Sequence, residues 1–186
     1  MVEQSLSVFP VGEPNAAFAQ HFIGQSYLAP LTLEQVPTFN VTFEPRCRNN
    51  WHIHHASEGG GQMLICVYGR GWYQEWGKEA RELHPGDVVN IPEGVKHWHG
   101  AAKDSWFQHL AIEVPGKDAR AEWCEPVSDE AYDLLPYTLI AWAGHKLAWL
   151  YKSISKPYYE WTSMVSSGII GLLAIIGTGG STYERE

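Results

Sequence analysis

The chain has 186 residues, of which 45% are hydrophobic, enough for one domain with a buried core. Its formal net charge of −8 argues against nucleic acid as a partner, because nucleic-acid-binding surfaces are basic. The N-terminus shows no basic start followed by an apolar run, and the three cysteines lack Cys-x-x-Cys spacing. We therefore expect reduced thiols and a cytoplasmic protein.

Residues 1–37 are predicted to form an N-terminal extension. Several prolines separate short apolar stretches there, and the stretch 18–33 is expected to contain one additional strand. Residues 38–135 show short apolar runs with frequent turn signals, which predicts an all-β barrel. The expected strands are Asn40–Glu44, Gln62–Tyr68, Gly71–Trp76, Ala80–Leu83, Asp87–Ile91, Ser105–Val114 and Arg120–Pro126.

Several features refine this barrel prediction. Cys66 is expected in the core, and Met63, Ile65 and Val67 are candidates for the core or the lining of a cavity. Ser128 is expected to cap a short C-terminal helix. Trp51 and Trp98 are neighbours of the histidines considered next, but with opposite parity, so we expect them outside the barrel cavity.

Three histidines carry the clearest chemical signal. His52 and His54 are two residues apart, so on a strand both point to the same face. His97 ends the segment Gly86-Asp87-Val88-Val89-Asn90-Ile91-Pro92-Glu93-Gly94-Val95-Lys96-His97, three residues after its Pro92-Glu93-Gly94 turn. Imidazole is the commonest metal ligand in proteins, so the pattern predicts a metal site; the alternative is an exposed strand without metal.

Residues 136–186 differ from the rest of the chain. They are rich in aromatic residues, and no charged residue occurs from 162 to 180. We expect a largely helical C-terminal extension. The segment 162–180 is long enough to contact or span a membrane, although its glycines, serines and threonines dilute its apolar character. A buried or oligomer-forming extension is the alternative.

The two histidine segments together resemble the motifs of the cupin superfamily. The first motif there is glycine, five residues, His-x-His, a few residues, glutamate, six residues and a second glycine. Arg46 replaces the opening glycine, and Gln62 stands where the family usually has glutamate, with six residues between it and Gly69. The resemblance implies a single jelly-roll barrel with one divalent metal held by His52, His54, Gln62 and His97. Glu58 is an alternative fourth ligand.

The stretch from Val41 to Ile112 is most similar to small bacterial cupins that include manganese-dependent hydroxynitrile lyases. That resemblance implies manganese as the metal, with iron, nickel, cobalt or zinc as alternatives. It also implies His109 as a catalytic base and His99 as its orienting or proton-sharing partner, with a pKa near the usual 6.5 serving proton transfer. A core role for His109 is the alternative, because it lies within an apolar run.

The expected function is therefore that of a metal-dependent enzyme acting on a small carbonyl or hydroxy compound, with cyanohydrin cleavage or formation as the specific reaction. The alternatives are a dioxygenase, isomerase or decarboxylase, and a non-catalytic module that binds a metal or small ligand. Small cupins commonly associate, so we expect a homodimer or higher homo-oligomer, in which the N-terminal extension exchanges a strand with a partner subunit.

Overall fold

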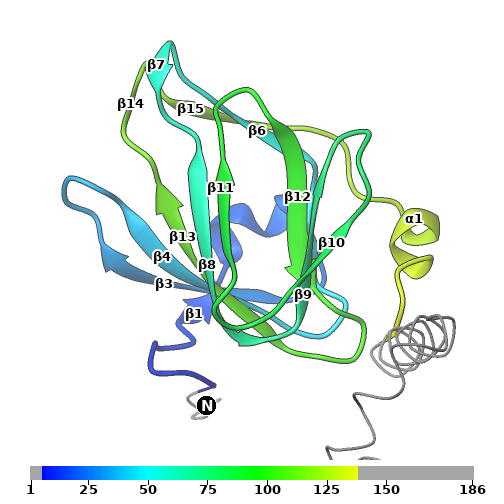
Figure 1. Cartoon of the computed structure of the whole chain (residues 1–186). Coiled ribbons are helices and arrows are strands. Elements are labelled where there is room, and N and C mark those ends of the chain that lie inside the picture. Colours follow the sequence, from blue (N-terminus) through cyan, green and yellow to red (C-terminus); the bar gives the residue numbers. More distant parts are fainter. Residues whose placement is uncertain (1–5, 138–186) are drawn as a thin grey trace, which may run out of the picture. The chain divides into compact units, whose positions relative to one another are not determined.

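Two antiparallel β-sheets form the barrel in the computed structural model, which describes residues 6–137 (Figure 1). The predictions for the rest of the C-terminal extension, including the segment 162–180, lie outside these residues. The first sheet contains, in spatial order, β1 (Glu13–Pro14), β3 (Ser26–Thr32), β4 (Thr38–Phe43), β13 (Phe107–Glu113), β8 (Gln62–Gly69) and β11 (Val88–Ile91).

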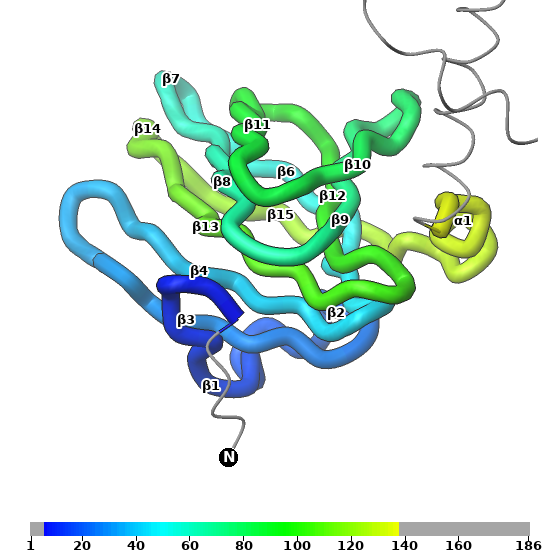
Figure 2. Tube along the Cα trace, turned by 60° about the horizontal axis from the view of Figure 1, so that its bottom comes forward, coloured from blue at the N-terminus to red at the C-terminus, as the bar shows by residue number. Residues whose placement is uncertain are grey.

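The second sheet holds the histidine segments. Its order is β10 (Arg81–Leu83), β9 (Gly71–Glu75), β12 (Lys96–Ala101), β5 (Arg48–Asn49) and β2 (Phe22–Ile23). In the same sheet β6 (His52–His55) pairs with both β12 and β15 (Arg120–Trp123). A separate ribbon joins β7 (Glu58–Gly59) to β14 (Gly116–Lys117). The tube in Figure 2 follows the chain around both sheets.

The predicted all-β jelly-roll class is confirmed, and each predicted strand overlaps an observed one. The stretch 18–33 contains two strands instead of the one expected: β2 pairs with β5, and β3 pairs with β4 of the same chain. Ser128 caps α1 (Asp129–Asp133) as predicted, since its hydroxyl accepts a hydrogen bond from the Ala131 amide. Arg46 adopts a φ of 71°, so an arginine occupies the left-handed conformation that the motif's glycine would favour.

Alternation along the strands determines which side chains fill the barrel. In β8, Leu64 and Cys66 are buried, as expected for Cys66, whereas Met63, Ile65 and Val67 are only half-buried on the opposite face. Those three are therefore not part of the buried barrel core. That core consists of Val41, Phe43, Cys47, Leu64, Cys66, Tyr73, Leu83, Val89, Ile91, Ala101, Phe107 and Ala111.

A second apolar cluster, the outer cluster, lies on the outside of the second sheet. It consists of Trp51, Trp72, Trp98, Ala102, Val127 and Tyr132. Trp51 and Trp98 thus pack outside the cavity, as their parity predicted. The segment that leads into α1 covers these two tryptophans. Arg48 anchors this segment: the Arg48 guanidinium donates to the Val127 carbonyl at 3.0 Å and lies over the Tyr132 ring.

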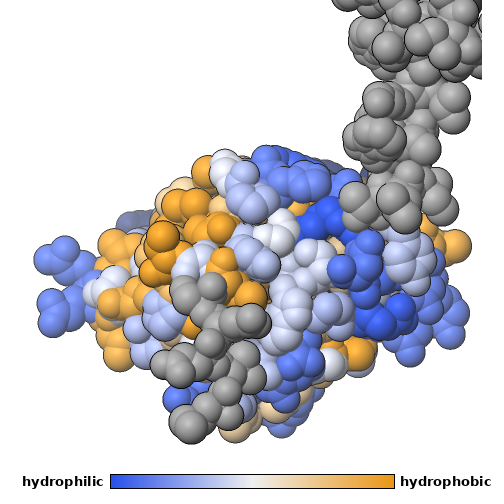
Figure 3. Space-filling view, turned by 90° about the horizontal axis from the view of Figure 1, so that it is seen from below, coloured by the Kyte–Doolittle hydropathy of each residue, from blue (hydrophilic) through white to orange (hydrophobic). Residues whose placement is uncertain are grey.

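Apolar side chains also reach the surface. In the face shown in Figure 3, orange residues gather on the side of the β3–β4 hairpin, and Leu33 and Val36 in that hairpin are exposed. The predicted homo-oligomer and its exchanged strand remain predictions. None of the helices formed by residues 6–137 is long and apolar enough to cross a bilayer.

Tyr132 offers a test of the outer cluster, because its side chain is fully buried and its hydroxyl donates to the Ala101 carbonyl at 2.7 Å. We expect Tyr132→Ala to lower the free energy of unfolding by about 3–5 kcal/mol, and Tyr132→Phe by about 1 kcal/mol. Urea unfolding measures both. The matched control is the exposed Leu134, whose change to alanine should cost less than about 0.5 kcal/mol.

Candidate metal centre and cavity

The structure brings His52, His54 and His97 together inside the barrel. His52 and His54 are two residues apart on β6, so their side chains point to the same face. His97 is the direct partner of His52 on the neighbouring β12. One ring nitrogen from each lies within 4.8 Å of the others, and all three side chains are buried. Strand alternation and this one register therefore suffice to make three imidazoles from two segments converge.

A hydrogen bond behind each ring determines which nitrogen faces the centre. Nδ1 of His52 lies 3.0 Å from the Asn50 carbonyl, and Nδ1 of His97 lies 2.9 Å from the Val95 carbonyl. Nδ1 of His54 lies 3.2 Å from a carboxylate oxygen of Glu113. Carbonyl and carboxylate oxygens can only accept, so each Nδ1 carries the hydrogen and Nε2 keeps its lone pair.

Two of these lone pairs lack protein partners in the described chain. Nε2 of His54 and Nε2 of His97 are both buried without a hydrogen bond. Burial lowers the pKa of His52 well below 6.5, and burial lowers the pKa of His97 to about 4, so both rings are neutral at pH 7. Neutral imidazoles with free, converging lone pairs fit a divalent metal ion.

Gln62, the first residue of β8, borders the same cavity as His52 and His54. Its Nε2 donates to Oε1 of Glu113 at 2.8 Å, and within residues 6–137 no group hydrogen-bonds to its buried Oε1. Glu58, the alternative ligand, lies instead in the β7–β14 ribbon with an exposed side chain 3.9 Å from Lys117. The structure therefore places Gln62 with the histidines, and not Glu58.

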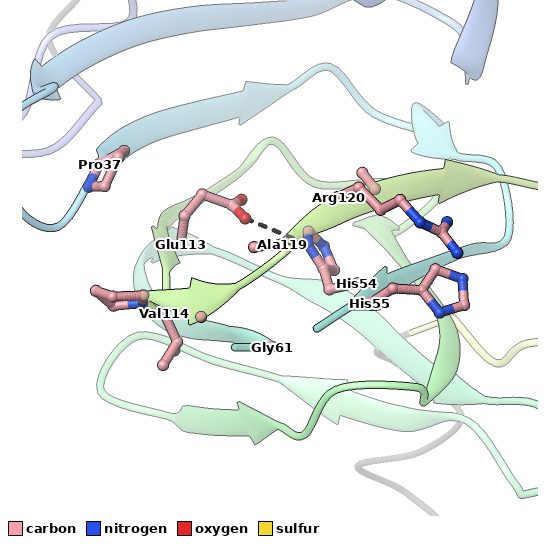
Figure 4. A pocket seen from close by; sticks show the side chains of 11 residues that line it. Pro37, His54, His55, Gly61, Glu113, Val114, Ala119 and Arg120 are labelled. Carbon is pink, nitrogen blue, oxygen red and sulfur yellow. Dashed lines mark ion pairs between the residues drawn. The ribbon is translucent and has the colours of Figure 1, made fainter. Parts of the chain in front are cut away.

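Glu113, at the end of β13, is a site residue that the sequence prediction missed. It has the same parity as His109 and Ala111, and that was the available signal. Burial acts to raise the pKa of Glu113, but hydrogen bonds from His54 and Gln62 outweigh it and hold the pKa below 4.5. In Figure 4 the Glu113 carboxylate points toward His54, while the side chains of His55 and Arg120 point away from Glu113.

His99 and His109 form a buried pair beside the three histidines. Nε2 of His109 lies 3.0 Å from Nδ1 of His99, and Asn49 accepts the His99 backbone amide at 2.9 Å. His99 lines the cavity with His52, whereas His109 is fully buried against Phe43 and Phe107.

The expectation of pKa values near 6.5 in this pair is wrong. Burial lowers the pKa of His99 well below 6.5, and burial lowers the pKa of His109 to about 4. Both rings are therefore neutral at pH 7. In the hydrogen bond between them one ring donates and the other accepts, and the Asn49 amide nitrogen lies 3.1 Å from Nε2 of His99.

A cavity of about 280 Å³ opens onto His52, His54, Gln62 and His99. Much of its remaining lining is apolar and includes Phe18 from the 3₁₀ helix η1 (Ala16–His21), Phe22, Leu28, Phe39, Val41, Ala111 and Trp123. A second hollow of about 410 Å³ lies on the outer side of His54 and Glu113, and both hollows share these two residues and Ala121 (Figure 4). The N-terminal segment thus supplies part of the wall of the first cavity.

The fold and the site define a small jelly-roll barrel whose interior carries histidines suited to a metal. Comparison with known families agrees: the cupin domain family matches residues 39–112. An (R)-mandelonitrile lyase from Granulicella tundricola is 42% identical over 118 residues, which cover 61% of this chain and 87% of that enzyme. The chain belongs to the cupin family.

A solved structure gives the same result for the fold. The crystal structure of a cupin-like protein from Thermotoga maritima is 36% identical and has a TM-score of 0.58. The match covers 67% of this chain and 93% of that one. Both comparisons therefore match proteins that this chain covers almost completely.

The buried histidines predict how stability depends on pH. In the unfolded chain a histidine binds its proton near pH 6.5, whereas His97 and His109 in the folded chain do so at about 4. Between these values the unfolded state binds more protons, so the free energy of unfolding should fall as pH decreases from about 6.5 toward 4. Urea unfolding of metal-free protein across this range measures it.

The matched pair is His109→Gln and His84→Gln, since His84 is exposed. In the His109→Gln variant the free energy of unfolding should depend less steeply on pH than in the wild type. The His84→Gln variant should match the wild type. Equal slopes for all three proteins would show that His109 is not held neutral by burial.

Proposed function

We propose that this cupin is a metal-dependent lyase that cleaves or forms a cyanohydrin of a small carbonyl compound. The observation that carries the proposal is a set of buried donor atoms without hydrogen-bond partners, on His54, His97 and Gln62. His97 lies with His52 and His54 in one cluster, and Gln62 lines the same cavity as His52 and His54. The 42% identity to an (R)-mandelonitrile lyase supports this reaction among the many that cupins perform.

His52, His54 and His97 would hold the ion through Nε2, and Gln62 through Oε1. Three nitrogens and one amide oxygen suit manganese, iron, nickel, cobalt or zinc, and we propose manganese. A divalent metal bound there supplies Lewis acidity toward a hydroxyl or carbonyl oxygen. No thiolate belongs to the set, which matches a hard or borderline ion.

The proton balance of the reaction requires a base inside the cavity. Cleavage breaks the bond between the hydroxyl-bearing carbon and the nitrile carbon, and the electron pair leaves with cyanide. The hydroxyl loses its proton, a carbonyl forms, and cyanide takes up a proton to become hydrogen cyanide. We propose that the His99–His109 pair handles the hydroxyl proton. The sequence predicted His109 as the base and His99 as its partner, and we propose the reverse order.

The cavity lining supports this order within the pair. His99 lines the cavity, so we propose that it exchanges the proton with the substrate. His109 lies behind it at 3.0 Å and shares the proton through their common hydrogen bond. His99 is thus the catalytic residue, and His109 a positioning and proton-sharing residue that acts through it.

The lining favours an aromatic substrate. Phe18, Phe22, Phe39 and Trp123 contribute rings to a cavity of about 280 Å³, and ring–ring contacts stabilise aromatic ligands. This agrees with the mandelonitrile named for the related enzyme. The direct test is synthesis of mandelonitrile from benzaldehyde and cyanide by metal-loaded protein; no turnover above metal-free protein would refute the lyase proposal.

An oxygenase is the second candidate, because the same nitrogen-rich donor set also suits redox-active iron. Activity that disappears without oxygen would identify it, since cyanohydrin chemistry consumes no oxidant. Binding of a small ligand without any turnover would indicate the non-catalytic module instead.

Metal content gives the next prediction. We expect purified protein, made without chelator, to carry about one first-row metal ion per chain by elemental analysis. His97→Ala should abolish metal retention because it removes a ligand from the centre of the site. Glu58→Gln is the control and should keep the metal; loss of metal from that variant would restore Glu58 as a ligand.

The histidine pair gives a separate prediction. We expect His109→Gln to retain metal and substrate affinity but to lower kcat by about 10²-fold or more, the scale of general acid–base catalysis. The pH profile of kcat should change as well, which loss of packing alone would not cause. His84→Gln should behave as wild type. Normal turnover in His109→Gln protein would assign His109 to the core alone.

A further inference from the structure

One carboxylate touches two of the four proposed ligands from behind. Oε2 of Glu113 lies 3.2 Å from Nδ1 of His54, and Oε1 accepts the Gln62 side-chain amide at 2.8 Å. Glu113 is the last residue of β13, and its direct partner across the strands is Gln62, the first residue of β8. Register thus sets the two side chains side by side.

This contact determines how the Gln62 amide is turned. A carboxylate can only accept, so the NH₂ group of Gln62 must face Glu113. The amide oxygen is consequently directed elsewhere, and it is buried without a partner in the described chain. The same carboxylate keeps the hydrogen of His54 on Nδ1, which leaves Nε2 free on the inner side. One side chain therefore prepares two donor atoms.

Charge gives Glu113 a second effect. Three neutral imidazoles and one amide contribute no net charge to balance a divalent cation. Glu113 supplies a carboxylate that contacts this set of residues. It contacts Nδ1 of His54 and the amide nitrogen of Gln62, and not the atoms that would bind the metal. Its side chain is 38% exposed toward the hollow of Figure 4, so solvent screens part of its field.

We propose that Glu113 is the positioning residue of this metal site: it orients both His54 and Gln62 and supplies, from behind them, the negative charge that offsets the cation. The proposal rests on the proposed function only in requiring that the site binds a metal. Nothing in it depends on which reaction the metal serves.

Charge relocation tests the proposal directly. Glu113→Gln keeps the size of the side chain but removes its charge and one of its two acceptor oxygens. Mn²⁺ affinity of the metal-free full-length protein, measured by calorimetric titration, should fall by about 10–100-fold, the usual effect of losing such a partner. The double variant Gln62→Glu/Glu113→Gln moves the carboxylate onto the donor atom and should regain most of the lost affinity.

The matched control is Glu122→Gln, which removes a carboxylate that pairs with His55, on the opposite face from His54. It should bind Mn²⁺ as the wild type does. The single variant Gln62→Glu gives an independent measurement. Two carboxylates then lie side by side and repel each other in the metal-free protein, and bound Mn²⁺ relieves that repulsion. Added Mn²⁺ should therefore raise Tm more than it does in the wild type. This reading does not require Glu113→Gln protein to fold.

The outcomes separate the two proposals. Wild-type protein that binds no Mn²⁺ and no other first-row metal refutes the proposed function itself. Wild-type binding that Glu113→Gln leaves unchanged refutes only the role of Glu113. If Glu113→Gln lowers the Mn²⁺ affinity and the double variant does not restore it, the charge argument is refuted. Orientation of the ligands alone would then account for the loss.

Discussion

The site depends on the hydrogen bonds behind its imidazoles. Each ring of His52, His54 and His97 has an oxygen acceptor at Nδ1, so each ring carries its hydrogen there and keeps the lone pair of Nε2. Without those acceptors a ring could rotate or change tautomer and offer a hydrogen instead of a lone pair. Two acceptors are backbone carbonyls and therefore belong to the fold. The third is the Glu113 side chain, so a substitution there can change the site without changing the backbone.

The barrel supports this arrangement from both sheets. The second sheet supplies the histidine strands β6 and β12, and the first supplies Gln62 on β8 and Glu113 on β13. The cavity is lined by residues of both sheets, and aromatic rings, among them Phe22, Phe39 and Trp123, form part of its wall. Outside the second sheet, the outer cluster and the buried Arg48 hold the C-terminal segment over the tryptophans next to the histidines.

Alternation made much of this predictable. The spacing of His52 and His54, and the turn before His97, predicted the three converging rings, and parity placed Trp51 and Trp98 outside. The same rule, applied to β8, would have excluded Met63, Ile65 and Val67 from the core once Gln62 was taken as inward-facing. Glu113 shared the parity of His109 but lay at a strand end, where a charged residue is usually solvated. The roles of Arg48 and of the pKa shifts could not be predicted, because burial depends on tertiary contacts that no local pattern contains.

Part of the cavity wall comes from a segment of the chain that supplies no ligand. Phe18 and Phe22, in the segment that precedes the cupin motifs, help to enclose the cavity, whereas the donor atoms lie beyond residue 51. Recognition therefore depends in part on residues that take no part in the metal chemistry. Substitutions in the N-terminal segment can diversify which molecules enter while the inner coordination stays constant, so relatives that share the histidines need not share a substrate.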